Sequence, residues 1–234
     1  MLRQTRSFNI QQKGSPVPEN EPAAVQPTFE PTAHHYATIL IEVLERKDPY
    51  TRGHAERVRN YVKMLVAELG WSDYLAQCAE VAAQLHDIGK LIVERSTIIN
   101  PSPYLTPQQH AELFDHPYHG AVIVRGNFPD EVMFGILQHH ERMDGKTHGV
   151  MYPAYPFGIP GEQIHPIAKC IAIADTFDAM TTQRSYNIPR SREDAATLLL
   201  QGAGTRHDPG FTKIFVERVI PRIVVTNTLP FPGM

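Results

Sequence analysis

Residues 82–90 read Ala-Ala-Gln-Leu-His-Asp-Ile-Gly-Lys, and the interpretation of the whole chain starts from this stretch. An apolar run brings His86 and Asp87 to adjacent positions, ends at a glycine and then supplies Lys90. Imidazole nitrogen and carboxylate oxygen suit divalent ions such as iron, manganese or zinc, and the two oxygens of Asp87 can bridge two ions. Lys90 would lie close enough to hold an anionic substrate. A His-Asp pair alone is also typical of an ordinary helix end, so partners are needed elsewhere in the chain.

Composition restricts the class of protein. The chain has 234 residues, 42% hydrophobic and 20% charged, which is typical of one sizeable globular domain. A formal net charge of −3 gives no support to binding a nucleic-acid polymer or a membrane surface. The N-terminus lacks the apolar core of a signal peptide, no apolar run approaches membrane-spanning length, and both cysteines lie inside apolar runs. A cytoplasmic protein with buried thiols is therefore expected.

Apolar residues recur at helical spacing through most of the chain, and no strand-period alternation persists, so the expected fold is all-α. Residues 1–32 are polar and rich in Gln and Pro, and are expected to form a disordered arm or linker. Residues 33–226 are expected to form one domain, followed by a tail over 227–234. The expected helices run to about residue 47, from about 51 to 69, from a Ser72 cap to about 85, from a Thr106 cap, from Asp115, after Pro129, through 164–175, and over about 192–201 and 211–218.

In five of these helical segments, side chains of a metal-binding type lie on the apolar face of the helix, which is expected to pack toward the core. A lone inward histidine is more often a hydrogen-bonded core residue than a ligand. Here that explanation must hold five times independently, and each unsatisfied buried polar group costs roughly 1–3 kcal/mol. Metal ions would satisfy all of these groups together. The predicted ligands are His54, His86, Asp87, His116, His139, His140 and Asp175.

Seven ligands exceed what one tetrahedral ion needs, so a pair of ions about 3.5–4 Å apart that shares Asp87 and Asp175 is expected. A water between two divalent ions loses its proton near neutral pH and becomes an in-line nucleophile, and the ions neutralise the phosphoryl oxygens. This arrangement suits hydrolysis of a phosphoester best. An oxygen-activating di-iron centre, which uses similar ligands, is the main chemical alternative.

The order of these motifs resembles the HD-GYP phosphodiesterases of the HD superfamily of metal-dependent phosphohydrolases. The resemblance covers about residues 36–215 and implies an HD-domain helical bundle around a buried binuclear metal site. It also implies hydrolysis of cyclic di-GMP to the linear dinucleotide or GMP, in bacterial signalling. The matching stretches are Asp48-Pro-Tyr-Thr-Arg-Gly-His54-Ala-Glu-Arg-Val58, His86-Asp87-Ile-Gly-Lys90, His116-Pro117, His139-His140-Glu141-Arg142 with Asp144-Gly145, and Ala174-Asp175 with Phe177-Asp178-Ala179.

The resemblance further implies the roles of site residues. The seven predicted ligands would bind two divalent ions, with iron or manganese expected first and zinc or nickel as alternatives. Asp87 and Lys90 would be the catalytic residues, and Lys90 and Arg184 would hold the substrate phosphates or base.

The sequence also gives expectations for residues near the predicted ligands. Glu141, Arg142 and Asp144 are expected to support the ligands. Because ligating imidazoles usually donate their other N–H to a partner, Glu141 and Arg142 are expected to orient the neighbouring histidines. Arg57 is expected to form a surface pair with a neighbouring glutamate, and His207 to be a turn residue.

Three positions depart from the family pattern. Tyr50 stands where some members carry a glutamate that holds a third metal, which favours two metals here. The Gly-Tyr-Pro signature becomes Ala-Tyr-Pro at 154–156 after an insertion, with 152–153 as the competing alignment, and Tyr155 is the residue expected to stack on guanine. Asn187 stands where relatives often place a lysine, three residues after the substrate-binding arginine.

The first expectation is therefore a binuclear-metal phosphodiesterase that acts on a cyclic dinucleotide, most readily cyclic di-GMP. The departures leave two alternatives. One is a catalytically weak, metal-containing receptor or adaptor that signals to a protein partner through the altered loop. The other is a phosphohydrolase of another nucleotide. A homodimer is compatible with each.

Overall fold

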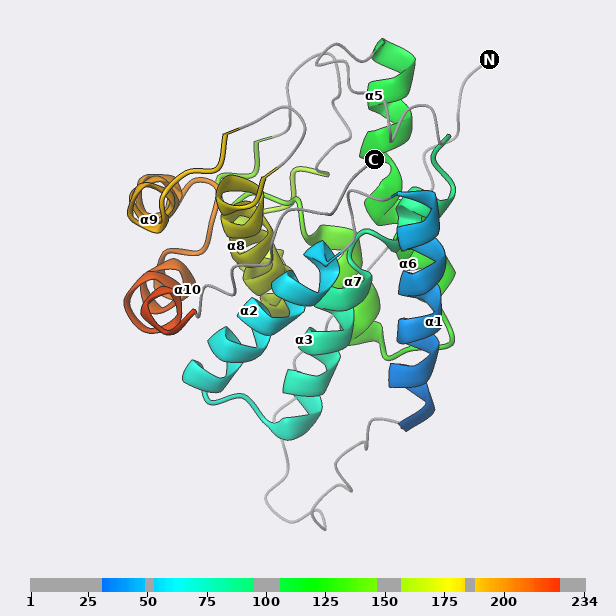
Figure 1. Ribbon diagram of the computed structural model, residues 1–234, viewed down its shortest axis with the longest axis horizontal. Coiled ribbons are helices and arrows are strands. Elements are labelled where there is room, and N and C mark those ends of the chain that lie inside the picture. Colours follow the sequence, from blue (N-terminus) through cyan, green and yellow to red (C-terminus); the bar gives the residue numbers. More distant parts are fainter. Residues whose placement is uncertain (1–30, 49–52, 95–105, 147–156, 184–187, 224–234) are drawn as a thin grey trace, which may run out of the picture.

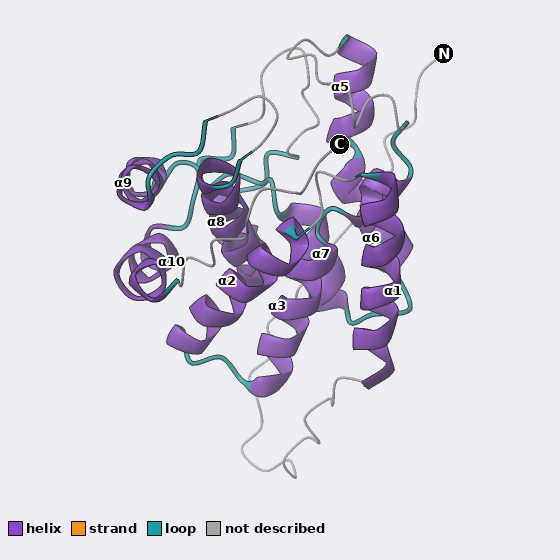
Figure 2. Cartoon of the chain, viewed as in Figure 1, coloured by secondary structure: helices purple, strands orange, loops and turns teal. Residues whose placement is uncertain are grey.

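The structure, a computed structural model, describes residues 31–48, 53–94, 106–146, 157–183 and 188–223 (Figure 1). Every regular element within these ranges is helical and none is a strand (Figure 2), so the predicted all-α class is confirmed. Among the described helices, none has the length and apolar character needed to cross a membrane. The predicted tail and nearly all of the predicted arm lie outside the described residues.

The helices lie close to the positions that the sequence predicts. The α-helices are α1 (Pro31–Lys47), α2 (His54–Glu68), α3 (Asp73–Leu85), α5 (Pro107–Phe114), α6 (His116–Val124), α7 (Asp130–Gln138), α8 (Pro166–Thr181), α9 (Arg192–Gly202) and α10 (Pro209–Ile214). Short 3₁₀ turns are η2 (Ile88–Leu91), η3 (Gly161–Gln163) and η5 (Ile220–Arg222), and η4 (Phe215–Val219) is a π-helical turn.

Two helix starts predicted from sequence have the expected caps. The Ser72 hydroxyl accepts the Leu75 N–H at the start of α3. At the start of α5, Thr106 and Gln109 form a reciprocal capping box, which satisfies two backbone donors that a helix leaves unpaired. The helix predicted over 211–218 differs, because the α geometry ends at Ile214 and a π turn follows.

The core lies between α2, α3, α7 and α8, which pack against one another. In Figure 1, α2 and α3 run side by side, α1 lies at one flank, and α9 and α10 lie at the opposite flank beside α8. The apolar stripes predicted for α2 and α3 face this core. Their fully buried members include Val58, Val62, Leu65, Ala79, Ala82 and Leu85.

Gly89 brings η2 against the start of α6. A Cβ atom at this position would lie 1.9 Å from the His116 carbonyl oxygen and 2.5 Å from the Gly120 nitrogen. Only glycine therefore permits this backbone approach. As a result, the end of α3, which carries Asp87 just after it, lies next to the start of α6.

Candidate metal centre

The predicted ligands come mainly from helix ends that meet at one place. His54 begins α2 and His86 caps the end of α3, and their Nε2 atoms lie 3.2 Å apart. The Asp87 carboxylate lies beside both imidazoles, with Oδ2 3.6 Å from His86 Nε2 and 3.8 Å from His54 Nε2. All three side chains are buried. One ligand atom from each lies within 4.8 Å of the others, so this first cluster can hold a metal ion.

A second cluster lies beside the first. It consists of His116, His139 and His140, whose ligand atoms also lie within 4.8 Å of one another. The Nε2 atoms of His116 and His139 are 3.3 Å apart. His116 begins α6, and His139 caps the end of α7.

The two carboxylates predicted to be shared lie at the junction of the clusters. Asp87 turns Oδ1 toward the second cluster, 3.2 Å from His116 Nε2, and Oδ2 toward the first. Asp175, on α8, has Oδ1 3.3 Å from His54 Nε2. The structure thus brings all seven predicted ligands together, and it directs the two oxygens of Asp87 to different clusters.

Backbone carbonyls fix three of the imidazole rings. The Nδ1 atoms of His86, His116 and His139 lie 2.8, 2.6 and 2.7 Å from the carbonyl oxygens of Ala83, Leu113 and Ile136. Each acceptor is three residues earlier, at a helix end where carbonyls lack helical partners. Because Nδ1 must carry the proton in these bonds, Nε2 of each neutral ring is left with a lone pair.

This tautomer pattern indicates whether the Nε2 atoms suit a bound cation. When His116 and His139 are neutral, two Nε2 lone pairs face each other at 3.3 Å with no proton between them. That contact is repulsive unless a cation accepts both lone pairs. Two ligands about 2.1 Å from one ion take a separation of this size, so the donor set fits a divalent metal.

Asp178 is a site residue whose role the sequence analysis missed. It is fully buried, and its carboxylate accepts His54 Nδ1–H at 2.7 Å and Arg57 Nε–H at 2.6 Å. Thr182 Oγ1–H donates to the same carboxylate at 3.1 Å. Arg57 is thus not the surface pair that was expected. The spacing of Asp178, three residues after Asp175 on the same helix face, was the available signal.

The charges of the first cluster are strongly coupled. Burial lowers the pKa of His54, but hydrogen bonds to Asp175 and Asp178 outweigh it and raise that pKa to about 9. Burial raises the pKa of Asp87, but the Lys90 ammonium and the nearby imidazoles hold it well below its ordinary value. In the metal-free protein, His54 therefore carries the proton that a metal ion must displace.

Two imidazoles of the second cluster, those of His139 and His140, are neutral. Burial lowers the pKa of His140 to about 3, and burial together with the neighbouring imidazoles holds the pKa of His139 well below its ordinary value. Neutral imidazole is the form that binds metal ions.

Lys90 lies against the centre. Its Nζ donates to Asp87 Oδ2 at 2.6 Å. Burial lowers its pKa, but Asp87 outweighs this effect and raises it, so the ammonium is charged. This cation balances the Asp87 carboxylate, and the predicted role of Lys90 in holding a substrate anion stays a prediction.

The predicted orientation of the histidines by Glu141 and Arg142 is wrong for His139, because a backbone carbonyl holds its Nδ1. Glu141 instead accepts the backbone N–H groups of residues 157–159. Arg142 forms a two-point ion pair with Asp144 at 2.9 and 2.7 Å. Glu141 and Asp144 therefore hold the loops around the site through these contacts.

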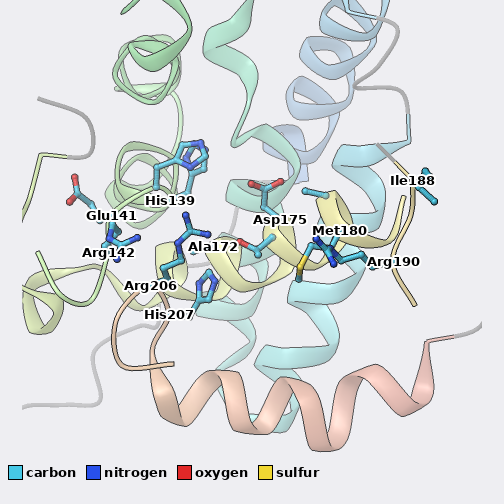
Figure 3. A pocket seen from close by; sticks show the side chains of 13 residues that line it. His139, Glu141, Arg142, Ala172, Asp175, Met180, Ile188, Arg190, Arg206 and His207 are labelled. Atoms are coloured by element: carbon cyan, nitrogen blue, oxygen red, sulfur yellow. The ribbon is translucent and has the colours of Figure 1, made fainter. Parts of the chain in front are cut away.

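A cavity of about 760 Å³ opens onto the second cluster (Figure 3). Its wall includes His139, His140 and Asp175, together with Arg190 and Arg206. Several further residues complete it: Glu141, Arg142, Ala172, Thr176, Ala179, Met180, Ile188 and His207. His207 is thus a buried cavity residue and not only a turn residue. Neither arginine was predicted, since no periodicity links residues 190 and 206 to the ligand helices.

Other predicted features lie outside the described residues. These are the substrate-binding Arg184, the stacking residue Tyr155, and the departures at Tyr50 and Asn187. Their predicted roles stay predictions.

Comparison with known proteins places this geometry in context. A family model described as "HD domain" matches residues 38–211, more than half of the chain. A Vibrio cholerae protein named "Probable cyclic di-GMP phosphodiesterase" is 30% identical over 190 residues, which cover 73% of this chain and 41% of that protein. The "Cyclic di-GMP phosphodiesterase response regulator RpfG" of Xanthomonas campestris is 31% identical over 173 residues, 73% of this chain and 44% of that protein. The chain thus spans less than half the length of these two relatives.

A solved structure shares the fold. The L. monocytogenes phosphodiesterase PgpH HD domain, in complex with cyclic di-AMP, superposes with a TM-score of 0.55 at 19% identity. The match covers 78% of this chain and 93% of that domain. At this identity the likeness concerns the helical fold.

Proposed function

This chain belongs to the HD domain family, and we propose that it is a metal-dependent phosphodiesterase that hydrolyses a cyclic dinucleotide, with cyclic di-GMP as the first candidate. The supporting observation is the convergence of two ligand clusters on one carboxylate, Asp87, beside a cavity. The names of the two sequence relatives support the choice of cyclic di-GMP.

The ligand set supports two divalent ions. We assign His54, His86 and Asp87 to one ion and His116, His139 and His140 to the other, with Asp87 shared and Asp175 beside the first. Imidazole and carboxylate donors favour iron or manganese, and zinc or nickel are alternatives. When bound, such a pair supplies an activated water and neutralises charge on the phosphoryl oxygens.

The residues of the chain orient and balance this centre. Asp178, which is itself held by Arg57, accepts a hydrogen bond from His54, and backbone carbonyls hold three other rings, so the Nε2 atoms converge without further adjustment. Lys90 places a positive charge beside Asp87, where it can bind a non-bridging phosphate oxygen. The cavity is of the size that encloses small organic ligands, about 300–1,000 Å³.

The test is turnover of cyclic di-GMP by protein loaded with manganese or iron, with separation of linear and mononucleotide products. Hydrolysis that needs the metal is expected. Lys90→Ala should keep the metal content and lose activity, because its charge acts on the substrate. Wild-type protein with a full metal content, micromolar nucleotide binding and no turnover would contradict the enzyme and favour the receptor alternative. Hydrolysis of a different nucleotide in a substrate panel would change the assigned substrate.

A further inference from the structure

The cavity has two flanks on either side of Asp175. Figure 3 shows Glu141, Arg142, Arg206 and His207 on one flank, and Met180, Ile188 and Arg190 on the other. Lys90 is not among the residues that line this cavity. A substrate that fills the cavity therefore meets guanidinium groups beyond the metal ligands.

The flank with Arg206 is held by a tight backbone turn between α9 and α10. One acceptor, the Gly202 carbonyl oxygen, receives the N–H groups of Thr205, Arg206 and His207 at 3.2, 2.8 and 3.1 Å. Gly204 has a φ of 80°, a left-handed conformation that favours glycine. The turn is also joined to the loop that follows His140, because the Asp144 N–H donates to the Thr205 carbonyl at 2.9 Å. Arg206 is therefore presented from a fixed backbone.

This flank carries the guanidinium groups of Arg142 and Arg206 and the Glu141 carboxylate, whose oxygens accept the backbone N–H groups of residues 157–159. Asp144 balances Arg142, but no ion pair involves Arg206 within the described part of the chain. His207 reports the local field. Burial first, and then the positive charges of Arg206 and Arg142, lower its pKa to about 4. The imidazole is thus neutral and only 7% exposed, and it forms a buried floor beside Arg206. A guanidinium group without an ion pair among the described residues, beside a neutral imidazole, favours a bound anion.

We propose that Arg206 binds the second phosphate of the cyclic dinucleotide, the one that is not hydrolysed. This inference rests on the proposed function. A cyclic dinucleotide has two phosphodiesters in one ring, so when one lies at the metal ligands the other can reach the adjoining cavity, where the exposed Arg206 guanidinium is available to pair with its charge. Guanidinium is well suited to phosphate, since its N–H donors match two phosphate oxygens.

The test compares two diesters on the same metal-loaded full chain. Cyclic di-GMP carries the second phosphate, whereas bis(p-nitrophenyl) phosphate has one phosphate and no base. Arg206→Gln should raise KM for cyclic di-GMP by about 10- to 100-fold with little change in kcat, because a charge-assisted hydrogen bond is lost. The loss of kcat/KM for the small diester should be much smaller. Arg125→Gln, an exposed arginine after α6, is the matched control.

Other outcomes would overturn the assignment. Equal losses of kcat/KM for both diesters, or no loss for cyclic di-GMP, would contradict a contact with the second phosphate. The assignment would also be contradicted if Arg190→Gln raised the KM for cyclic di-GMP and Arg206→Gln did not. Arg206→Lys should restore part of the KM, since the ammonium keeps the charge that attracts phosphate but lacks the two-point fork, whereas a base edge read by the guanidinium fork would not be restored at all. If wild-type protein hydrolyses neither diester, the proposed function fails, and calorimetric binding of cyclic di-GMP to wild type and Arg206→Gln still decides this inference.

Discussion

At the scale of single residues, the site depends on fixed imidazole tautomers. Backbone carbonyls accept the Nδ1–H of His86, His116 and His139, and Asp178 does the same for His54. Asp178 differs from a carbonyl because it is charged, and together with Asp175, whose effect is larger, it raises the pKa of His54. The His54 imidazole is therefore more basic than those of His139 and His140.

Asp178→Asn tests this partner. The amide keeps the size of the side chain but removes the charge that holds His54 and Arg57. Loss of such an outer partner typically weakens metal binding by about 10- to 100-fold. Competition with a chelator would measure the affinity, and Asp130→Asn, an exposed carboxylate in the first turn of α7, is the control. Equal affinity in all three proteins would contradict the role of Asp178.

The histidines also predict how the stability of metal-free protein depends on pH. The pKa of His54 is raised to about 9, so its contribution is complete below about pH 6.5 and is lost as the pH rises through 9. The pKa values of His140 and His207 are lowered to about 3 and about 4, so their contributions are complete above about pH 6.5 and are lost as the pH falls.

Chelator-treated protein should therefore be most stable near pH 6.5. Each group changes the free energy of unfolding by at most about 1.4 kcal/mol per pH unit between its folded and unfolded pKa. Urea unfolding between pH 5 and pH 9 would measure the profile. A stability that keeps rising from pH 6.5 to pH 9 would contradict the protonated His54.

The sequence predicted well which histidine and aspartate side chains come together, and it predicted their hydrogen-bond partners poorly. A ligand such as His54 lies on an apolar stripe, which helical periodicity reveals. Asp178 also lies on a buried face. Its partner His54 lies on another helix, α2, and no sequence spacing links a carboxylate on one helix to the histidine that it supports on another. Arg206 and His207 approach the site through a turn, and turn positions lack any periodic relation to the ligand helices.

At the scale of elements, Gly89 controls how closely η2 and α6 approach. Gly89→Ala would place a Cβ atom 1.9 Å from the His116 carbonyl oxygen, so α6 must move and carry His116 with it. We expect a loss of stability of about 1–3 kcal/mol, as for other overpacked cores, and weaker binding of the metal at the second cluster.

Gly210→Ala is the matched control for that change. A Cβ atom there would meet only Asp208 Oδ1, at an ordinary 3.5 Å. Urea unfolding and metal content of both variants give the comparison. Wild-type metal content in Gly89→Ala would contradict the claim that this contact positions His116.

Helix existence was largely predictable, whereas backbone proximity was not. The caps at Ser72 and Thr106 are local signals, because each acts within three residues of its own position. The role of Gly89 depends on Gly120, far along the chain, and a local pattern reveals the glycine but not its neighbour. The π turn after Ile214 likewise had no signal in the apolar spacing.

At the scale of the whole molecule, ligands from α2, α3, α6, α7 and α8 meet at one centre. The chain between His54 and Asp175 closes around it, so metal binding and the packing of five helices are linked. Motif order along the chain predicted this closure, because each motif lies where a helix end can bring it inward. The limits of the predicted domain and the residues that would read the base lie outside the described ranges, so those predictions stay untested.

The most direct test of the central claim is the metal content of the purified chain, measured by mass spectrometry beside that of Asp87→Ala. We expect about two divalent ions per wild-type chain, since Asp87 directs one oxygen to each cluster. We also expect Asp87→Ala to lose most of both ions while its helical content is kept. An Asp87→Ala protein with the wild-type metal content would contradict the shared centre and the function built on it.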